Sequence, residues 1–449
     1  MRDTFTQIVI LNQVKMLSFL CMQKNKLKIG LLGAGTVGSG VIKALQNHDF
    51  VEIKKVGVKD LNKKRDFLVG LNGNKPDITS NLNEIVSDPE IGIVVEVLGG
   101  LNPARELVTL AIKNKKHIVT ANKDLIATYG PELFDLAKEN NVQIQFEASV
   151  CGGIPIINTL KQTLSANNFS KIIGILNGTT NYILTEMLNK NLSFDVCLKE
   201  AQKLGYAEPD PTNDVSGKDS AYKIAILASI AFHERIKINE VFTEGIQKIT
   251  LEDILLAEEL GYRLKLIGLA KKESDKKIDI RVHPAFIKKT NTLSSVLGAN
   301  NGVLVEGDLV GELTLIGKGA GSMPTASSVA GDINLLVAQV SSSQKPNPQF
   351  VCQHTKFAEV KPISETSNCY FLRIKTEDKA GVVGQLGTIF GKHEVSINTL
   401  TQRGTNQDNT ASITMLTHLV KEEKLQKALE EIKKTGSVKQ IENVIRVLE

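Results

Sequence analysis

The chain has 449 residues, of which 42% are apolar and 23% charged, which is typical of a globular protein with two or three domains. Its net charge of +5 is spread along the chain, which argues against a nucleic-acid-binding protein. Five cysteines without CxxC spacing predict free thiols and a cytoplasmic location, and the scattered histidines predict no transition-metal site.

Residues 1–25 contain the mildly apolar stretch "IVILNQVKMLSFLCM", which Asn12, Gln13 and Lys15 interrupt. A membrane-spanning helix needs about 20 apolar residues, so this stretch is too short, and it lacks a signal-peptide cleavage pattern. We predict a flexible extension, or a start codon assigned too early with Met22 as the working start, and no membrane attachment.

Residues 26–150 alternate between strand and helix patterns. Strands are predicted at "LKIGLLG", "VEIKKVGVKD", "IGIVVEVLGG", "IVTANK" and "VQIQFEASV", and helices lie between them. Such alternation predicts an α/β fold with a parallel, doubly wound, Rossmann-like sheet.

Residues 151–320 no longer alternate regularly between strand and helix patterns, and they predict a mixed α/β catalytic and dimerisation domain. Glycine-rich loops precede helices at 193–204, 217–232 and 251–260, and strands follow at "KIDIRVHPAF" and "GVLVEGDLVGELTLIGKG". The segment "GAGSMPTASSVAGDINLLVAQV" predicts a glycine turn and a helix of about 15 residues, which at about 320–340 returns to complete the first domain.

A linker is predicted at 341–368, where "SSSQKPNPQ" is rich in turn-forming residues. The remaining residues, 369–449, follow the order strand, helix, strand, strand, helix, strand. This βαββαβ order predicts a ferredoxin-like domain.

The string "GLLGAGTVGSG" has GxGxxG spacing at Gly33, Gly35 and Gly38. The first glycine permits a tight turn, the second lets a pyrophosphate approach the backbone, and the third lets helix and strand pack closely. Because the motif follows a predicted strand and opens a predicted helix, it predicts a dinucleotide-binding site.

The end of the second strand, "VKDLNKKR", leaves the choice of dinucleotide open. Asp60 suits the ribose 2′-hydroxyl of NAD, whereas Lys59, Lys63, Lys64 and Arg65 suit the 2′-phosphate of NADP. The cations modestly favour NADPH over NADH, but such runs are commonly only a solvated face.

Lys123 closes a later strand in "TANK". Ligands of open parallel sheets lie beyond the carboxyl ends of the strands, so Lys123 is expected near the nicotinamide. The alternative is an ordinary surface lysine.

The stretch "AEPDPTNDVSGKDSAYK" places Asp219 and Lys223 four residues apart on one predicted helix, which Ser216 or Asp214 is expected to cap. Lys223 lies where the helix becomes apolar, so its ammonium is expected to be partly buried and able to transfer a proton. Glu208 is expected to accept a substrate ammonium. The alternative is a simple helix salt bridge beside an acidic loop, worth only about 0.3–0.5 kcal/mol.

Several strings together resemble homoserine dehydrogenase: "GLLGAGTVGSGV", "VVEVLGG", "VTANKDLIA", "FEASVCGGIPII", "LNGTTNYIL", "LGYAEPDPTNDVSGKDSAYKIAILA" and "GAGSMPTASSVAGD". The resemblance spans about residues 26–340, in the family's order. It implies reversible reduction of L-aspartate 4-semialdehyde to L-homoserine with NADPH or NADH, on the route to threonine and methionine.

The resemblance also implies roles for individual residues. Lys223 is similar to the catalytic acid/base and Lys123 to a second lysine near nicotinamide and substrate, while Glu208, Asp219 and Thr179 are similar to substrate contacts. The implied cofactor contacts are Gly33, Gly35, Thr36, Val37, Gly38, Lys59, Gly99, Thr120, Lys123, Gly205 and Gly321. Backbone carbonyls of "EASVCGGI" are implied to hold a monovalent cation such as Na⁺, at Glu147, Val150, Gly152 and Ile154.

The C-terminal unit resembles an ACT domain through "DKAGVVGQLGTIFGKHEVSINTLTQ". An effector site is implied at Asp378, Gly381, Asn398 and Gln402, with threonine as feedback inhibitor. The alternative is a dimerisation module without ligand. A homodimer or homotetramer is expected.

Two other functions are compatible with parts of this sequence. One is an aldehyde-oxidising, phosphate-dependent dehydrogenase with Cys151 as nucleophile, which would need a base beside the thiol. The other is a dinucleotide-binding sensor with an amino-acid-binding ACT module, which would not need Glu208, Asp219 and Lys223.

Overall fold

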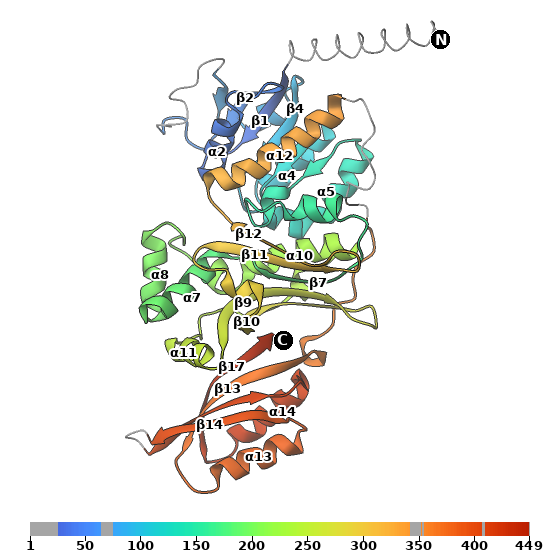
Figure 1. Ribbon diagram of the computed structural model, residues 1–449. Coiled ribbons are helices and arrows are strands. Elements are labelled where there is room, and N and C mark those ends of the chain that lie inside the picture. The colour runs from blue at the N-terminus through green and yellow to red at the C-terminus, as the bar shows by residue number, and fades with distance from the viewer. Residues whose placement is uncertain (1–25, 64–74, 342–351, 353, 406–408, 449) are drawn as a thin grey trace, which may run out of the picture. The chain divides into compact units, whose positions relative to one another are not determined.

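The computed structural model describes residues 26–63, 75–341, 352, 354–405 and 409–448. Two compact units make up the chain, Met1–Ser165 with Ala320–His354, and Ala166–Gly319 with Thr355–Glu449, and each is described by itself (Figure 1). The extension predicted at 1–25, the cations Lys64 and Arg65, and residues 342–351 and 353 of the predicted linker lie outside the described residues. Within the described part of the chain, no helix has the length and apolar character needed to span a membrane.

Unit 1 contains a six-stranded parallel sheet in the order β3-β2-β1-β4-β5-β6, which confirms the predicted Rossmann-like fold. The strand order reverses beside β1, and ligands of such sheets lie at this switch point, beyond the strands' carboxyl ends. The strands are β1 (Leu27–Leu32), β2 (Val51–Gly57), β3 (Asp77–Thr79), β4 (Ile91–Glu96), β5 (His117–Thr120) and β6 (Ile144–Gln145). The helices are α2 (Thr36–Leu45), α3 (Asn83–Val86), α4 (Ala104–Lys113), α5 (Lys123–Glu139), α6 (Ile156–Asn158) and α12 (Ser322–Ser341).

Helix α12 returns to this unit as predicted, but it has 20 residues instead of about 15. Its buried residues Ala326, Val329, Ile333 and Leu336 recur at helical spacing and join the core around β1 and α2. The helix is longer because it begins at Ser322, directly after the glycine turn. The strand predicted across 142–150 is shorter than expected, since the chain enters a 3-10 turn at Glu147–Ser149.

Unit 2 is built on a sheet in the order β12-β11-β7-β9-β10-β17-β13-β15-β14. Neighbours along this path are antiparallel, except that β10 and β17 are parallel, with Ala285 opposite Arg446. The strands are β7 (Phe169–Ile175), β8 (Phe242–Thr243), β9 (Tyr262–Lys272), β10 (Ile278–Lys288), β11 (Asn300–Gly307), β12 (Gly311–Lys318), β13 (Ser367–Glu377), β14 (Ile397–Thr405), β15 (Thr410–Thr417), β16 (Val420–Lys421) and β17 (Val438–Leu448). The helices are α7 (Gly178–Lys190), α8 (Phe194–Lys203), α9 (Thr212–Val215), α10 (Lys218–Phe232), α11 (Leu251–Glu259), α13 (Val382–Lys392) and α14 (Glu422–Lys433).

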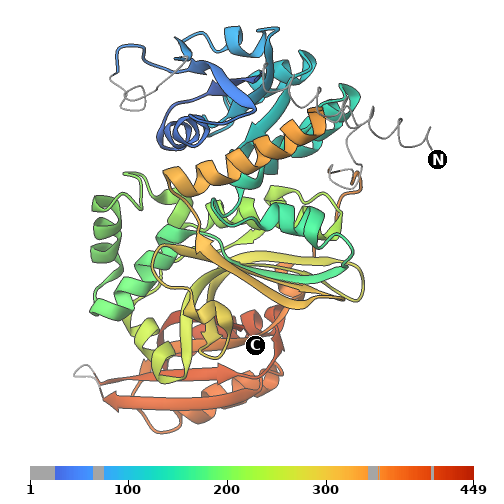
Figure 2. The same ribbon diagram turned by 45° about the horizontal axis from the view of Figure 1, so that its top comes forward.

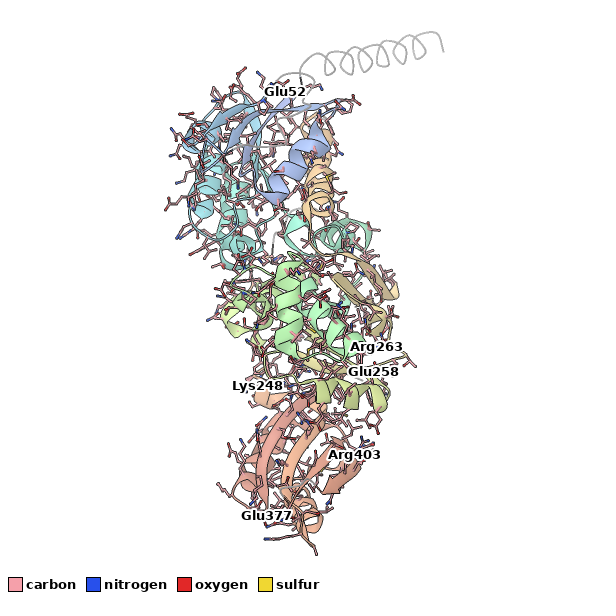
Figure 3. All side chains as sticks on the ribbon, turned by 90° about the vertical axis from the view of Figure 1, so that its left-hand side faces the viewer. Glu52, Lys248, Glu258, Arg263, Glu377 and Arg403 are labelled. Atoms are coloured by element: carbon pink, nitrogen blue, oxygen red, sulfur yellow. The ribbon has the colours of Figure 1, made fainter. Side chains whose placement is uncertain are left out.

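The C-terminal part of unit 2 has the predicted ferredoxin-like order β13, α13, β14, β15, α14, β17. Helices α13 and α14 cover one face of its strands (Figures 1 and 2), and Tyr370, Leu386, Phe390 and Leu425 lie in the core between them. The other part of unit 2 contacts this domain through side chains as well as through the sheet. Arg403 of β14 pairs with Glu259 at the end of α11, and Figure 3 shows Arg403 on the same side of the unit as Glu258.

Candidate active site

The glycine motif forms a tight turn between β1 and α2. Gly33 has φ +106°, and a Cβ there would lie 2.9 Å from the carbonyl oxygen of Val97. A Cβ on Gly38 would lie 2.2 Å from the carbonyl oxygen of Gly33, whereas a Cβ on Gly35 would have no neighbour within 4 Å. Helix α2 begins at Thr36 with no acidic residue in its first turn. The turn therefore leaves space at Gly35 and a positive helix end, which fits the pyrophosphate of a nicotinamide dinucleotide.

We expect Gly38→Ala to raise the dissociation constant for NADPH by about 10-fold or more, because the added methyl displaces the turn that faces the pyrophosphate. Fluorescence titration of NADPH measures the effect. Gly331→Ala is the matched control, since a Cβ there meets no atom within 4 Å and α12 continues through it. Equal affinities of the two variants would contradict the assignment.

The carboxyl ends of β4 and β5 are joined by a buried glutamate that the sequence analysis missed. Glu96 is fully buried, and burial raises the pKa of its carboxyl group. Thr120 Oγ1 donates to Glu96 at 2.6 Å, and the Glu96 carboxylate also accepts the Leu98 N–H at 2.8 Å. Through Glu96, the Thr120 hydroxyl therefore helps to fix the turn after β4. Thr120 itself lies at the carboxyl edge of the sheet, where the cofactor is predicted to bind. A single acid inside the apolar run "IVVEV" was its only sequence signal.

Gly99 and Lys123 lie in the two turns that this edge supports. Gly99 has φ +76° and lies three residues after the end of β4. Lys123 is the first residue of α5, and its side chain is partly exposed, 3.8 Å from the Asp124 carboxylate. Asn122 caps α5 by accepting the Leu125 N–H at 3.1 Å and donates to the Gly100 carbonyl at 2.6 Å. Lys59, by contrast, is exposed beyond β2.

In unit 2, Lys223 is held as the sequence predicts. Its Nζ donates to Asp219 Oδ2 at 2.7 Å and to the Leu176 carbonyl at 2.8 Å. The two side chains are only 12% and 10% exposed, so this is a largely dry ion pair and not a solvated one. Asp219 also accepts from Asn177 Nδ2 at 2.8 Å. A lysine in such a setting is positioned to transfer a proton.

The predicted caps of this helix are wrong. Helix α10 begins at Lys218 and is preceded by Gly217, which has φ +84° and makes no side-chain cap. The positive φ favours a glycine there, and a Cβ would also lie only 3.1 Å from Val282 Cγ1 of β10. The Asp214 carboxylate instead accepts from Asn177 Nδ2 at 2.7 Å.

Asn177 is therefore a central residue of the site that was missed. Its amide nitrogen bridges Asp214 and Asp219, and its amide oxygen caps α7 by accepting the Thr180 N–H at 2.8 Å. Its signal was an asparagine in "LNGTTN", a residue type typical of N-caps, but the sequence analysis predicted no helix where α7 lies.

The remaining predicted substrate contacts, Thr179 and Glu208, lie on two segments of unit 2 that contact each other. Thr179 Oγ1 donates to the Tyr206 carbonyl at 2.5 Å, which ties α7 to the chain before Glu208. Gly205 has φ +76° with open space around its Cα. The Glu208 residue is exposed, so its carboxylate can be reached by a ligand. In unit 1, Gly321 turns the chain into α12 with φ +121°.

Lys265 on β9 is a second missed residue of this region. It is buried, and its Nζ donates to Asn181 Oδ1 at 2.8 Å and to the Val296 carbonyl at 2.6 Å. Burial lowers the pKa of Lys265 to about 7. The lysine fixes Asn181, and with it the first turn of α7, on which Thr179 lies.

Lys265 predicts a pH dependence of stability. Its folded pKa of about 7 lies below the ordinary value of 10.5, so the unfolded chain binds more protons between these limits. Between pH 7.5 and 9, wild type should gain up to about 1.4 kcal/mol of unfolding free energy per pH unit relative to Lys265→Met. Denaturant unfolding of both proteins measures this slope, and Lys271→Met, an exposed lysine on the same strand, is the control. A difference that does not change with pH would contradict the prediction.

The predicted cation loop turns sharply in unit 1. Cys151 and Gly152 both have left-handed backbones, with φ 56° and 46°. The Gly152 carbonyl accepts from Ser328 Oγ of α12 at 2.6 Å. The buried Glu147 carboxylate accepts the N–H groups of Ile157 and Asn158, and burial raises its pKa to about 7. Across the described residues, no group of three or more histidine, cysteine or acidic side chains is arranged to hold a metal ion.

The predicted effector residues are partly brought together. Gln402 Nε2 of β14 donates to Asp378 Oδ1 at 3.3 Å, and Gly381, with φ +91°, directly precedes α13. Asn398 lies on β14 and accepts from Thr399 Oγ1 at 2.9 Å.

Comparisons with known proteins agree with this geometry. Residues 33–147 match the family "Homoserine dehydrogenase, NAD binding domain", residues 155–334 match "Homoserine dehydrogenase" and residues 370–437 match "ACT domain". A homoserine dehydrogenase of Synechocystis sp. is 46% identical over 435 residues, which cover 94% of this chain and 99% of the relative. The chain belongs to the homoserine dehydrogenase family.

Other homoserine dehydrogenases give the same result. The Bacillus subtilis protein is 40% identical, with 94% of this chain and 98% of the relative covered. A crystal structure from Thiobacillus denitrificans superposes with a TM-score of 0.89 at 39% identity, covering 95% of this chain and 99% of that one. A hyperthermophilic archaeal homoserine dehydrogenase in complex with NADPH has a TM-score of 0.60 at 27% identity, covering 72% and 99%.

The chain is therefore an NAD(P)-dependent oxidoreductase that acts on a CH–OH group, with an ACT domain at its C-terminal end. The two rival functions lack this support. Cys151, the nucleophile of the first rival, is also fully buried.

Proposed function

We propose that the chain reduces L-aspartate 4-semialdehyde reversibly to L-homoserine, with Lys223 as the acid that protonates the developing alkoxide. The carrying observation is the Lys223 ammonium, which is largely buried between the Asp219 carboxylate and the Leu176 carbonyl. The nicotinamide cofactor supplies the hydride. In the reverse direction Lys223 takes the proton back as a base.

The other polar residues of this region bind and orient. Asp219 keeps the Lys223 ammonium in place, and Asn177 keeps Asp219 in place. We assign the exposed Glu208 to the substrate ammonium and Thr179 to the positioning of that segment. Lys123, which begins a helix at the carboxyl edge of the parallel sheet, is assigned to the nicotinamide and the substrate.

We assign the remaining cofactor contacts to the glycine turn, to Lys59 and to Gly99, Thr120, Gly205 and Gly321. NADPH is preferred over NADH in this proposal, because the Asp60 carboxylate accepts the Asn62 N–H at 2.8 Å while Lys59 is exposed beside it. The proposed domains are a dinucleotide-binding domain at 26–150, completed by about 320–340, a catalytic and dimerisation domain at 151–320 and an ACT domain at 369–449. Residues 1–25 are the proposed extension and 341–368 the proposed linker.

Further parts of the proposal concern ions, regulation and assembly. Carbonyls of Glu147, Val150, Gly152 and Ile154 bind a monovalent cation, since carbonyl oxygens are hard ligands. Threonine binds the ACT domain beside Asp378 and Gln402, which contact each other. The chain forms a homodimer or homotetramer. A cytoplasmic location suits the four described cysteines, which are free thiols.

A spectrophotometric assay of NADPH and NADH oxidation with L-aspartate 4-semialdehyde tests the proposal. We expect turnover with both cofactors, a higher kcat/KM with NADPH, stimulation by Na⁺ and inhibition by threonine. No turnover with either cofactor would reject the proposed reaction. Turnover without a response to threonine would reject only the effector.

A further inference from the structure

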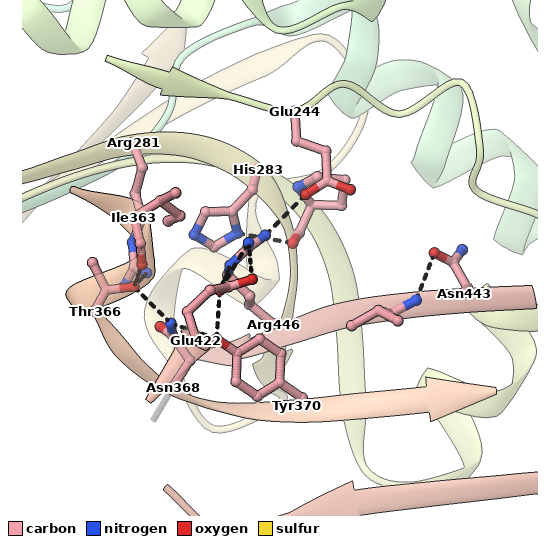
Figure 4. Close-up of polar contacts among 12 residues, drawn as sticks. Glu244, Arg281, His283, Ile363, Thr366, Asn368, Tyr370, Glu422, Asn443 and Arg446 are labelled. Atoms are coloured by element: carbon pink, nitrogen blue, oxygen red, sulfur yellow. Dashed lines mark hydrogen bonds and ion pairs between the residues drawn. The ribbon is translucent and has the colours of Figure 1, made fainter. Parts of the chain in front are cut away.

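Arg446 on β17 links the ACT domain to the rest of unit 2. Its guanidinium contacts both oxygens of Glu422, the first residue of α14, at 3.0–3.1 Å, and Tyr370 also donates to Glu422. Arg446 Nη1 then donates to Glu244 Oε2 at 2.9 Å (Figure 4). Arg446 and Glu422 are buried, so the guanidinium is fixed on its ACT side and holds Glu244 with its remaining nitrogen.

Glu244 belongs to a short loop that packs directly on the segment before α10. Its N–H donates to the Val282 carbonyl of β10 at 2.8 Å, and the Ile246 N–H donates to the Val215 carbonyl at 2.9 Å. Between them, a Cβ on Gly245 would lie 2.1 Å from that same Val215 oxygen. The loop and the end of α9 are therefore in backbone contact, with no side chain between them.

The same loop lies close to Gly217, the residue that directly precedes α10. A Cβ on Gly217 would lie 3.2 Å from Thr243 Cγ2 and 3.3 Å from the Glu244 carbonyl oxygen. Gly217 directly precedes the helix, and Asp219 and Lys223 follow on its first two turns. A displacement of the loop therefore moves the start of the helix that carries both residues.

We propose that Arg446 and Glu244 are positioning residues for the reaction. Their ion pair holds loop 243–246, and through it the start of α10, in the place that Lys223 needs. The inference rests on the proposed role of Lys223. A positioned proton donor loses rate steeply when it is displaced by about 1 Å, so a pair that touches no substrate affects turnover through geometry.

A second ion pair between the same two parts of unit 2 provides the control. Arg373 of β13 pairs with Glu252 in the first turn of α11, as Arg446 pairs with Glu244. The glutamates are 57% exposed for Glu252 and 38% exposed for Glu244, and without them the buried arginines keep Asp253 and Glu422 as partners, so loss of either glutamate should cost little stability. Glu252 lies on α11, whereas the Glu244 loop packs against the start of α10.

The test compares Glu244→Ala with Glu252→Ala in the full-length protein. We expect Glu244→Ala to lower kcat about 3- to 10-fold, a typical size for coupling between distant groups, with the KM for NADPH and the melting temperature unchanged. Glu252→Ala should stay within about 2-fold of wild type, as surface ion pairs do. Equal kcat values for the two variants, or a loss that follows the melting temperature, would overturn the proposal.

Arg446→Lys gives a second, independent variant. Lysine keeps a positive charge beside the buried Glu422, but it lacks the planar guanidinium whose several N–H groups contact two carboxylates at once. We expect the same loss as for Glu244→Ala, and no further loss in the double variant, because both act through one contact. Losses that multiply would overturn the proposal. Retained turnover in Lys223→Ala would instead reject the proposed role of Lys223, so the two failures are distinguishable.

Discussion

Lys223→Ala should lower turnover about 10²- to 10⁴-fold, the range that a positioned general acid contributes, while the affinity for NADPH is kept. The Lys223 ammonium lies within hydrogen-bonding distance of Asp219 and the Leu176 carbonyl, and α10 holds both charged residues on one face. Alanine removes the proton source and leaves the glycine turn of unit 1 untouched. Steady-state kcat at saturating NADPH, together with NADPH titration, measures the two quantities separately.

Two further variants sharpen this test. Lys218→Ala removes an exposed lysine from the first turn of the same helix and should keep turnover within about 2-fold, since exposed surface substitutions rarely matter. Lys223→Arg keeps the charge but not the acidity, because a guanidinium does not release its proton near neutral pH. It should therefore be almost as slow as the alanine variant. An active arginine variant would mean that charge alone matters.

The parts of the site that were predictable are those that depend on local spacing. Strand–helix alternation predicts the parallel sheet of unit 1. The Asp219–Lys223 pair follows from a separation of four residues on one helix. Both arguments need only neighbours in sequence, and the structure has both features.

The parts that were missed depend on contacts between distant residues. Asn177 reaches Asp219 across 42 positions, and Lys265 reaches Asn181 across 84. The predicted capping by Ser216 or Asp214 failed for the same reason. Capping rules describe an isolated helix end, whereas here Asp214 accepts from the distant Asn177 and Gly217 occupies the cap position.

The parallel pairing of β10 and β17 joins the sheet of the ACT domain to the rest of unit 2, and side-chain ion pairs such as Arg403 with Glu259 add to it. In the sequence, this junction appears only as an arginine inside the apolar end "NVIRVLE". Burial of that arginine against Glu422 requires a partner for its charge, and the second partner, Glu244, lies on the loop that packs against the start of α10.

Asp219→Asn should lower kcat about 10- to 100-fold, because removing one charge of a largely buried pair leaves the other without its partner. Asparagine keeps the shape and can still accept from Asn177 Nδ2, so the loss reports the charge and not a cavity. If Asp219 acts through Lys223, the KM for the semialdehyde should change less than kcat does. Asp210→Asn, an exposed acid of the same segment that accepts from Thr212, is the control.

The double variant Lys223→Ala with Asp219→Asn separates the two roles considered for Asp219. If Asp219 only positions the Lys223 ammonium, it has no further role once Lys223 is replaced. The Asp219→Asn substitution should then add less than about 3-fold to the loss, because substitutions of residues that act as a unit are not additive. Fully multiplied losses, with a raised KM for the semialdehyde, would instead mean that Asp219 binds the substrate directly. In that case the Leu176 carbonyl would be the group that positions the Lys223 ammonium. Asn177, whose amide donates to Asp219, would then orient a carboxylate that binds the substrate.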